Sequence, residues 1–487
     1  MMAYKHGINV TEQATSVTTP IVGTAGLQVI IGTAPVNMAE DPYKCTNKPM
    51  LCYSFGEAVK NVGYSDDFKN YTLCQSIDAC FRVFNIAPIV LINVLDPTKH
   101  KKEIEATTCA IENGIAKLEE AGVLLDTVVV KNATEVETLT ADVDYILSFG
   151  DAGELIITML GDHEKDAEIK VSATAIDPTA VDYTDIIGGM DTNTGAESGM
   201  EVIRQVRPLL GMTPGLLLAP SWSQNANVAA VLQAKCEKIN GVFTCECVVD
   251  IDCSENGATK YTDVKTVKEK AGISSIHAYP VWPKVKIGNK VYYFSALAAA
   301  CTAYTDAANE DVPSVSPSNK SLKITATVLE DETEVILDQD QATVVNSFGV
   351  ATAWNQNGYI LWGNNTAGYP TTTDPKDRWF PCRRFFSWWG NSFIQTYFKK
   401  VDNPMNTRLI DSIVDSENIR GNSYAARGFC AAAVIKYHAD ENPATDILNG
   451  IIRFHMYLAP YTPAETIEAI LEFDVNALTA VLTGGAS

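Results

Sequence analysis

Four of the twelve cysteines lie close together in the sequence and are the first candidates for chemistry. They are Cys236, Cys245, Cys247 and Cys253. A structural zinc site usually combines C-x2-C pairs, whereas this chain has a C-x-C within VFTCECVVDID, an apolar run typical of a buried strand. Metal binding stays open as an alternative, but the pattern favours buried, reduced thiols of a cytosolic protein.

Two loops have some features of ion-binding sites. DIDCSENGATKY, which begins at Asp250, has the acidic spacing of a calcium loop. However, Glu255 takes the position that needs glycine and Tyr261 the one that needs glutamate. TNTGAESG, at residues 192–199, precedes an expected helix and could hold an anion at the helix N-terminus. A solvated turn and a structural β-to-α turn are the favoured interpretations.

Motifs of known enzymes are mostly absent. The chain has no G-x-S-x-G, no GxxxxGK[ST], no H-E-x-x-H and no G-x-G-x-x-G after an expected strand. Its six histidines have no recognisable catalytic spacing. The sequence therefore predicts no catalytic residue, no cofactor-binding residue and no cofactor.

The most unusual segment is RRFFSWWGNSFIQTYFKK at residues 383–400, where seven of eighteen residues are aromatic and basic pairs stand at both ends. Trp389, Phe393 and Tyr397 recur at i, i+4 and i+8, and Phe386 lies one turn earlier. We therefore expect one face of a helix here to be buried. Large aromatic and basic side chains away from that face suit an interface with another molecule. These candidate contacts are Trp388, Lys399 and Lys400.

The length, charge and apolar stretches of the chain limit its possible functions. At 487 residues the chain is too long for one ordinary core, so several domains are expected. Its formal net charge of −22 argues against general affinity for nucleic acid or anionic lipid. The first residues lack the charged and apolar regions of a signal peptide, and no apolar stretch is long enough for a membrane span.

The elements that must position these residues follow an α/β order. Apolar runs within 26–36 and 87–97 predict buried strands with a helix between them. Strands and helices alternate again after residue 188, which predicts an open, mostly parallel, doubly wound sheet. Ser223 is the expected N-cap of the helix after GLLLAP.

The charge changes sign along the chain. Residues 98–187 carry 19 acidic and 7 basic side chains in short alternating runs, which predict an inserted β-sandwich-like domain. Residues 376–438 carry ten basic and five acidic side chains and predict an α+β domain. The expected division is 1–20 as an N-terminal extended arm, 21–97 plus 188–365 as a central α/β domain, 98–187 as the inserted acidic outer domain, 366–471 as a C-terminal α+β domain and 472–487 as a C-terminal arm.

Both ends of the chain have the pattern of extended segments without a core of their own, as expected of segments that add a strand to a partner's sheet. Alternate side chains would then enter pockets of that partner. They are Ile8, Val10 and Val17 in the N-terminal arm and Leu471, Phe473, Val475 and Leu478 near the other end.

The order of these segments resembles the tail sheath proteins of contractile phage tails and phage-tail-like particles. The stretches that carry the resemblance are GLQVIIGTAPVN, DYILSFGDAGELIIT, TGAESGMEVIRQVRPLLGMTPGLLLAPSWSQNANVAAVLQAKCEK, NSFGVATAWNQNGYILWGNNT and RRFFSWWGNSFIQTYF. The resemblance covers nearly the whole chain, and the order of the segments is its most specific aspect.

The resemblance implies a subtilisin-like central domain, which describes the fold alone because no Ser/His/Asp signature is present. It implies a structural subunit and no enzyme. Such subunits polymerise as stacked hexameric rings around a tail tube and contract to drive the tube through a target cell envelope. The arms reach into neighbouring subunits, the C-terminal domain faces the tube and the inserted domain faces outward, so Trp388, Lys399 and Lys400 become candidate tube or neighbour contacts.

The partners implied are the chain itself, the tail tube protein, and the baseplate and tail terminator proteins, without nucleic acid or membrane insertion. The expected location is a phage tail or a phage-tail-like particle, such as an R-type bacteriocin, assembled in the cytoplasm of the bacterial host. The sequence does not separate a phage from a bacteriocin. Two other interpretations stay open: an α/β hydrolase-like enzyme and a soluble acidic scaffold or binding protein.

Overall fold

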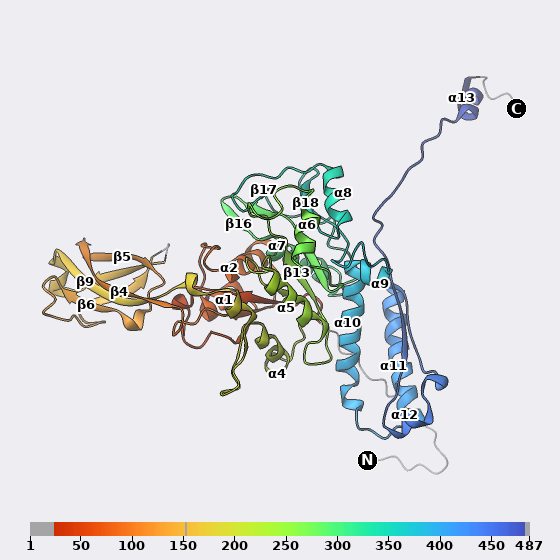
Figure 1. Ribbon diagram of the computed structural model, residues 1–487, viewed down its shortest axis with the longest axis horizontal. Coiled ribbons are helices and arrows are strands. Elements are labelled where there is room, and N and C mark those ends of the chain that lie inside the picture. The colour runs from red at the N-terminus through yellow and green to blue at the C-terminus, as the bar shows by residue number, and fades with distance from the viewer. Residues whose placement is uncertain (1–23, 151–152, 483–487) are drawn as a thin grey trace, which may run out of the picture.

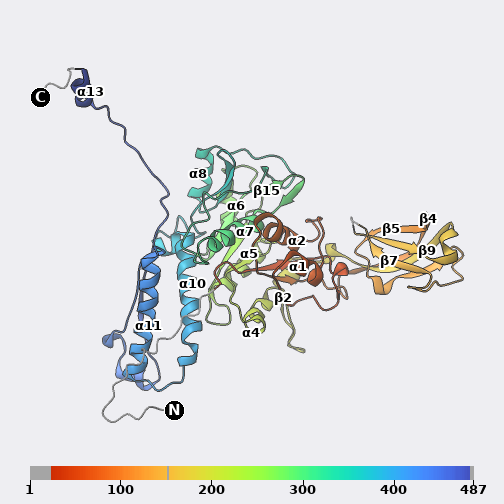
Figure 2. The ribbon, with the colours of Figure 1, turned by 180° about the vertical axis from the view of Figure 1, so that it is seen from behind.

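The computed structural model describes residues 24–150 and 153–482. These residues form a row of parts, with a central α/β part between a β domain at one end and two long helices at the other (Figures 1 and 2). The last described segment projects away from the body (Figure 1). The expected arm at residues 1–20 lies outside the described residues.

The central part is built on a six-stranded, mostly parallel sheet. Its strands lie in the order β14 (Ala278–Val281), β13 (Glu246–Asp250), β12 (Leu216–Leu218), β1 (Gln28–Gly32), β3 (Ile89–Asn93) and β2 (Pro49–Cys52). All neighbouring strands are parallel except the edge strand β2, which is antiparallel to β3. The predicted strands within 26–36 and 87–97 are β1 and β3, which lie side by side.

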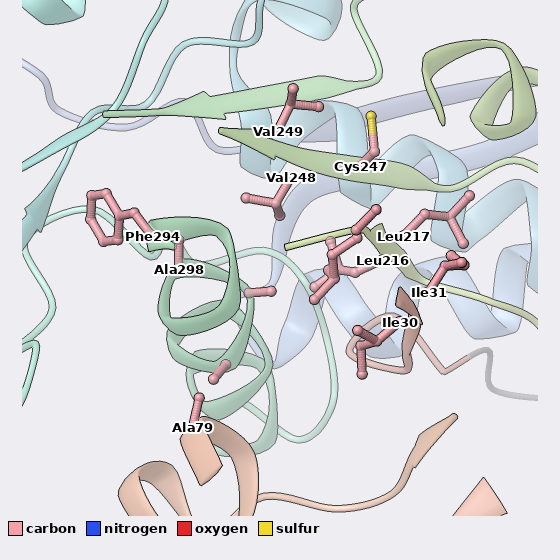
Figure 3. Close-up of a cluster of buried hydrophobic side chains, with 14 of the residues drawn as sticks. Ile30, Ile31, Ala79, Leu216, Leu217, Cys247, Val248, Val249, Phe294 and Ala298 are labelled. Carbon is pink, nitrogen blue, oxygen red and sulfur yellow. The ribbon is translucent and has the colours of Figure 1, made fainter. Parts of the chain in front are cut away.

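Helices cover both faces of this sheet, which explains the continuous apolar runs of its strands. One face packs against α7 (Phe294–Ala307) and against α2 (Leu73–Ile77), which continues into a π-helix at Asp78–Phe84. The other face packs against α5 (Ala226–Glu237) and a 3-10 helix at Gly199–Gln205. Figure 3 shows the core that results, with side chains of β1, β12 and β13 beside those of α7.

Shorter elements complete the central part. Its other α-helices are α1 (Phe55–Val62), α3 (Tyr183–Ile187), α4 (Val206–Leu210), α6 (Val264–Lys270) and α8 (Gln339–Ser347). Its small antiparallel sheets are β10 (Gly189–Met190) with β11 (Glu197–Ser198), β15 (Lys284–Ile287) with β16 (Lys290–Tyr292) and β17 (Ala326–Val328), and β18 (Thr352–Asn355) with β19 (Tyr359–Trp362).

The expectation that Ser223 caps helix α5 is wrong. The helix begins at Ala226, and the side chain of Asn225 accepts the capping hydrogen bond from the backbone N–H of Asn227. Ser223 instead donates from Oγ to Oδ2 of Asp250, at 2.9 Å. The hydroxyl group that the sequence pattern assigned to the helix N-terminus is therefore bonded to Asp250, at the end of β13.

The inserted β domain has a hydrophobic core of its own. Its antiparallel strands lie in the order β6 (Val129–Asn132), β9 (Glu168–Ile176), β4 (Lys101–Glu112), β5 (Ile115–Ala121), β8 (Glu154–Met159) and β7 (Tyr145–Phe149). The sequence pattern does not identify β4 and β5, because most side chains of both strands are exposed and their apolar alternation is weak. Val181 and Ile186, inside the expected range 98–187, pack in the main core.

The C-terminal part consists of helices beside a two-stranded hairpin. The helices are α9 (Pro375–Arg378), α10 (Phe380–Tyr397), α11 (Thr407–Ala426) and α12 (Ala444–Leu448), and the antiparallel strands are β20 (Cys430–Lys436) and β21 (His455–Pro460). In Figure 1 the two long helices α10 and α11 run side by side at the end opposite the inserted domain, and Figure 2 shows the same arrangement.

The C-terminal segment is only partly extended, which corrects the expectation of an extended arm. Residues 461–474 have neither helix nor strand, but α13 (Val475–Leu482) follows them. Asp474 accepts a hydrogen bond on its side chain from the N–H of Ala477, at 2.9 Å, in the manner of an N-cap. Alanine and leucine favour helix, so Val475 and Leu478 lie in a short helix.

Candidate assembly surface

Helix α10 is fixed to the central part by a buried ion pair. Arg384 is only 1% exposed. Its guanidinium donates from Nη1 to Oδ1 of Asp306 at 2.9 Å and from Nη2 to Oδ2 of the same carboxylate. Nη2 also donates to the carbonyl oxygen of Ala25 at 3.0 Å. One side chain therefore ties α10 to α7 and to the segment that leads into β1.

A row of polar side chains extends this attachment along one face of α10. Ser387 donates to Oε1 of Glu246 at 2.6 Å, and Gln395 donates to Oγ1 of Thr213 at 3.0 Å. Between them, Asn391 accepts from the N–H of Thr244 and donates to its carbonyl oxygen. Because residues 387, 391 and 395 are four apart, they lie on the same helical face. This face joins α10 to the starts of β12 and β13.

The neighbouring face of α10 packs against α11 through aromatic side chains. The buried guanidinium of Arg420 lies 4.1 Å from the centre of the Trp389 ring. Tyr424 of α11 meets the rings of Trp388 and Trp389 edge-on, with centroids 5.4 and 5.5 Å away. These contacts place the aromatic segment between two packed surfaces.

The expectation that Trp388 lies on the free surface of this helix is therefore wrong. Trp388 is only 3% exposed and belongs to the same buried cluster as Phe385, Trp389 and Tyr424. A single amphipathic stripe assumes one buried face, whereas α10 is buried on two. Of the expected stripe, Trp389 and Tyr397 are buried, and the others are half-buried.

The two lysines that follow α10 are more accessible. They lie in a 3-10 turn at Phe398–Lys400, where Lys399 is exposed and Lys400 is half-buried. The side chain of Phe398 and that of Val401 are exposed as well. The accessible part of the aromatic segment is thus its C-terminal end, at the tip of the helix pair.

The C-terminal segment leaves the body at an anchored point. Nη2 of Arg378 donates to Oε2 of Glu465 at 2.8 Å, and its guanidinium lies 3.9 Å from the Trp379 ring centre. Beyond this ion pair the apolar side chains are exposed, with Leu471 at 93% and Phe473 at 76%. Val475 and Leu478 are exposed too. Ile8, Val10 and Val17 lie outside the described residues.

The cysteine cluster belongs to the core. Cys236, Cys245, Cys247 and Cys253 are free and buried, as the pattern favoured. Burial raises the pKa of Cys253 to about 12, which keeps the thiol protonated at neutral pH. Among residues 24–150 and 153–482, no group of three or more His, Cys, Asp and Glu side chains could hold a metal ion.

No helix in the same residues is long and apolar enough to cross a membrane.

The carboxyl ends of the parallel strands are where α/β folds commonly bind ligands. Here Asp250, at the end of β13, is buried and bonded on both oxygens. Ser223 donates to Oδ2, while Ser295 donates from its backbone N–H to Oδ1 at 2.8 Å and from Oγ to Oδ2. No histidine ring in the described part of the chain hydrogen-bonds to a serine or cysteine side chain. Because Asp250 accepts a hydrogen bond from the backbone N–H of Ser295, in the first turn of α7, it acts as a cap for that helix.

This cap makes the stability of the subunit depend on pH. Burial raises the pKa of Asp250 to about 6, compared with about 3.9 in an unfolded chain. The folded state therefore binds the proton more tightly, and the stability linked to this group is present below pH about 4 and is lost as the pH rises through about 6. Asp250→Asn cannot ionise. The melting temperature of this variant minus that of the native chain should therefore increase between pH 4 and pH 7. The increase corresponds to a relative gain of about 3 kcal/mol in the free energy of unfolding.

Thermal unfolding of the two unassembled proteins in matched buffers measures this difference. The comparison cancels the pH dependence of all other groups, because the two proteins share them. A difference in melting temperature that does not change between pH 4 and pH 7 would show that Asp250 has an ordinary pKa.

Comparison with known proteins shows that the chain is similar in sequence to tail sheath proteins. The chain is 25% identical over 466 residues to the tail sheath protein of Burkholderia phage BcepMu, an alignment that covers 92% of each chain. It is 23% identical over 293 residues to the tail sheath protein of Escherichia phage P2, covering 58% of this chain and 69% of that protein. No family model matches the chain.

A solved structure shares the fold. It is the sheath complex of an extracellular contractile injection system, PVC, in the contracted state. The TM-score is 0.56 at 14% identity, and the match covers 98% of this chain and all of that chain. The resemblance to tail sheath proteins is therefore confirmed over nearly the whole length of the chain.

Proposed function

We propose that this chain is the structural subunit of a contractile tail sheath. It would polymerise as stacked hexameric rings around a tail tube and contract to drive the tube through a target cell envelope. The observation that carries the proposal is the C-terminal segment, whose apolar side chains at Ile467, Ile470, Leu471 and Phe473 are exposed. Exposed apolar surface of this kind usually marks a binding site for another protein. The similarity to tail sheath proteins indicates which protein, namely further copies of the chain.

In this proposal the two arms connect neighbouring subunits. Each arm would add a strand to the hairpin of a neighbour, because main-chain hydrogen bonds give such a contact its affinity and alternate side chains give it specificity. The N-terminal arm would use Ile8, Val10 and Val17. The C-terminal segment would use Leu471 and Phe473, followed by Val475 and Leu478 of α13.

The proposed layout follows the charge of the parts. The inserted domain, with 19 acidic and 7 basic residues at 98–187, would face outward, and the basic C-terminal part would face the tube. Lys399 and Lys400, at the tip of the helix pair, remain candidate contacts to the tube protein or a neighbour. Baseplate and tail terminator proteins are the other proposed partners, in a phage or bacteriocin particle assembled in the host cytoplasm.

Contraction would move each subunit as a rigid body while the arms keep neighbours connected. The attachment of α10 to the central part supports this, because Arg384 and the row from Ser387 to Gln395 bond α10 to the central part at several points along the helix. We also propose that the central sheet, with helices on both faces, is of the doubly wound, subtilisin-like type. Catalysis is not part of the proposed mechanism.

Removal of residues 1–18 tests the proposal. The full-length chain, expressed alone, is expected to form long tubular sheaths that are visible by negative-stain electron microscopy. The truncated chain should keep the same circular dichroism spectrum and melting temperature but should stay as single subunits, because it lacks one connecting arm. Long sheaths formed by the truncated protein would contradict the role of this arm.

The same preparation separates the other interpretations. A hydrolase would react with a serine-directed activity probe, and a soluble acidic scaffold would purify as a small oligomer of fixed size. Either result, without tubular assemblies under any assembly condition, would contradict the proposed function.

A further inference from the structure

Lys268 of helix α6 places its charged group inside the central part, where the residue is only 6% exposed. Its Nζ donates to the carbonyl oxygens of Phe348 at 2.6 Å, Ala367 at 2.7 Å and Tyr369 at 3.1 Å. Burial lowers the pKa of Lys268 to about 8, so the amine is still mostly protonated at pH 7. A lysine ammonium has three N–H donors, and the three carbonyl oxygens match them one to one.

Gly349 leaves the space that this site needs. Its φ of 69° lies in the left-handed region, which favours glycine. A Cβ atom at this position would lie 2.5 Å from the carbonyl oxygen of Tyr369 and 3.0 Å from Nζ of Lys268. A side chain at position 349 would therefore push the ammonium and this carbonyl oxygen apart.

The segment 365–369, which Lys268 holds through two carbonyl oxygens, also supports Arg378. Nε of Arg378 donates to Oδ1 of Asn365 at 2.9 Å, and the guanidinium lies 4.4 Å from the centre of the Tyr369 ring. The backbone N–H of Thr366 donates to the carbonyl oxygen of Arg378 at 2.8 Å. Both the side chain and the main chain of Arg378 are thus placed by residues 365–369.

Arg378 in turn anchors the C-terminal segment through its ion pair with Glu465. In Figure 1 the segment leaves the body beside α9, the helix that ends at Arg378. Because residues 461–474 have neither helix nor strand, no ladder of main-chain hydrogen bonds fixes their direction. Side-chain contacts such as this ion pair must do so. A continuous row of contacts therefore runs from Lys268 through Tyr369 and Arg378 to Glu465.

We propose that Lys268 is a positioning residue for the C-terminal segment. Its ammonium fixes residues 367–369, and these hold Arg378 where it binds Glu465. The inference rests on the proposed function for the segment's role as a connecting arm, and it names what sets the direction of that arm before assembly. It also accounts for a charged group in the core, because an apolar side chain at this position would leave three carbonyl oxygens without these donors.

A nitroxide spin label at residue 466, next to the anchor, tests the proposal in the free subunit. Thr466→Cys supplies an exposed thiol, whereas the twelve native cysteines are all buried. The electron paramagnetic resonance spectrum should show restricted motion of the label in the otherwise native chain. Lys268→Met should make the mobile component the main one, as should Glu465→Ala, which breaks the ion pair directly. An unchanged spectrum for Lys268→Met would overturn the proposal.

Lys265→Met is the matched control. Lys265 lies on the same helix, but its side chain is exposed and reaches Glu269 only at 4.0 Å, so the spectrum should match that of the native chain. Lys268→Met added to Glu465→Ala should increase the mobile component no further, because both changes act on the same row of contacts. An added increase as large as that in the native chain would show that Lys268 acts elsewhere.

The variant Lys268→Ala separates loss of the ammonium from a general loss of structure. Propylammonium has the carbon and nitrogen atoms that this substitution removes. Added propylammonium chloride should restore the restricted spectrum and raise the melting temperature, whereas tetramethylammonium chloride at the same concentration, which has no N–H donor, should not. No recovery, or equal recovery with both salts, would contradict the role of the ammonium.

These measurements are independent of polymerisation, because all spectra come from the free subunit. Failure of the native chain to assemble would contradict the proposed function and leave the spectra as they are. A spectrum that does not respond to Lys268→Met would contradict the positioning role even if the native chain forms sheaths.

Discussion

Replacement of Arg384 by methionine is expected to lower the free energy of unfolding by about 3–5 kcal/mol. The substitution keeps much of the side-chain volume but leaves the buried carboxylate of Asp306 without its partner. It also leaves the carbonyl oxygen of Ala25 without this donor. Breaking a buried ion pair in this way costs more than the pair itself contributes, because a charge remains inside the protein.

The sign of the pH dependence follows from Asp306. Burial raises the pKa of this carboxyl even beside Arg384, and loss of the guanidinium should raise the pKa further. Stability linked to a raised carboxyl pKa is present at low pH and is lost as the pH rises through it. The deficit of Arg384→Met should therefore be smaller at pH 5 than at pH 8, as measured by urea unfolding of the unassembled subunit.

Two controls make this result specific. Arg427→Met removes an exposed partner of Glu310 and should cost no more than about 1 kcal/mol. The double variant Arg384→Met with Asp306→Leu removes both charges and should recover most of the loss. A cost at Arg384 equal to that at Arg427 would show that the buried pair does not hold α10 to the central part.

Truncation after Glu465 is expected to abolish polymerisation without unfolding the subunit. The removed residues include Leu471 and Phe473, and none of the described residues among them is buried. The Arg378–Glu465 ion pair is retained. The melting temperature should change by less than about 2 °C, or roughly 1 kcal/mol. Electron microscopy should show single subunits where the full-length chain forms sheaths.

A pair of substitutions distinguishes the contact from mere chain length. Leu471→Asp with Phe473→Asp places charge on the face proposed to dock and should prevent assembly as truncation does. Glu468→Gln with Glu472→Gln alters neighbouring charged side chains without adding charge to that face, and should leave assembly intact. Sheaths of normal length from the Leu471/Phe473 variant would contradict the proposed contact between the C-terminal segment and a neighbouring copy.

Local patterns were sufficient for the buried strands of the central sheet that lie within residues 26–36 and 87–97. The strands β1 and β3 are buried on both faces, so their apolar runs identify them without tertiary information. The sequence pattern does not predict strand β4, because most of its side chains are exposed. It does not predict helix α13, because the segment before this helix alternates like a strand.

The errors and omissions in the candidate surface have one cause. Periodicity shows that a helix has a buried face but does not show how many neighbours it has, so Trp388 was placed on the surface. No pattern in the sequence pairs Arg384 with Asp306 or Ser223 with Asp250, because the members of each pair lie on different elements, 78 and 27 residues apart in the chain. These contacts depend on tertiary packing, which a single sequence does not display.

Helical reconstruction of the assembled particle by electron cryo-microscopy tests the central proposal most directly. The account predicts rings of six copies stacked in a helical lattice, with the inserted domain outermost and the C-terminal part innermost. The C-terminal segment of one copy, with Leu471 and Phe473, should form a strand beside the hairpin of another. A closed oligomer, or a lattice in which residues 461–482 contact no other copy, would contradict the account.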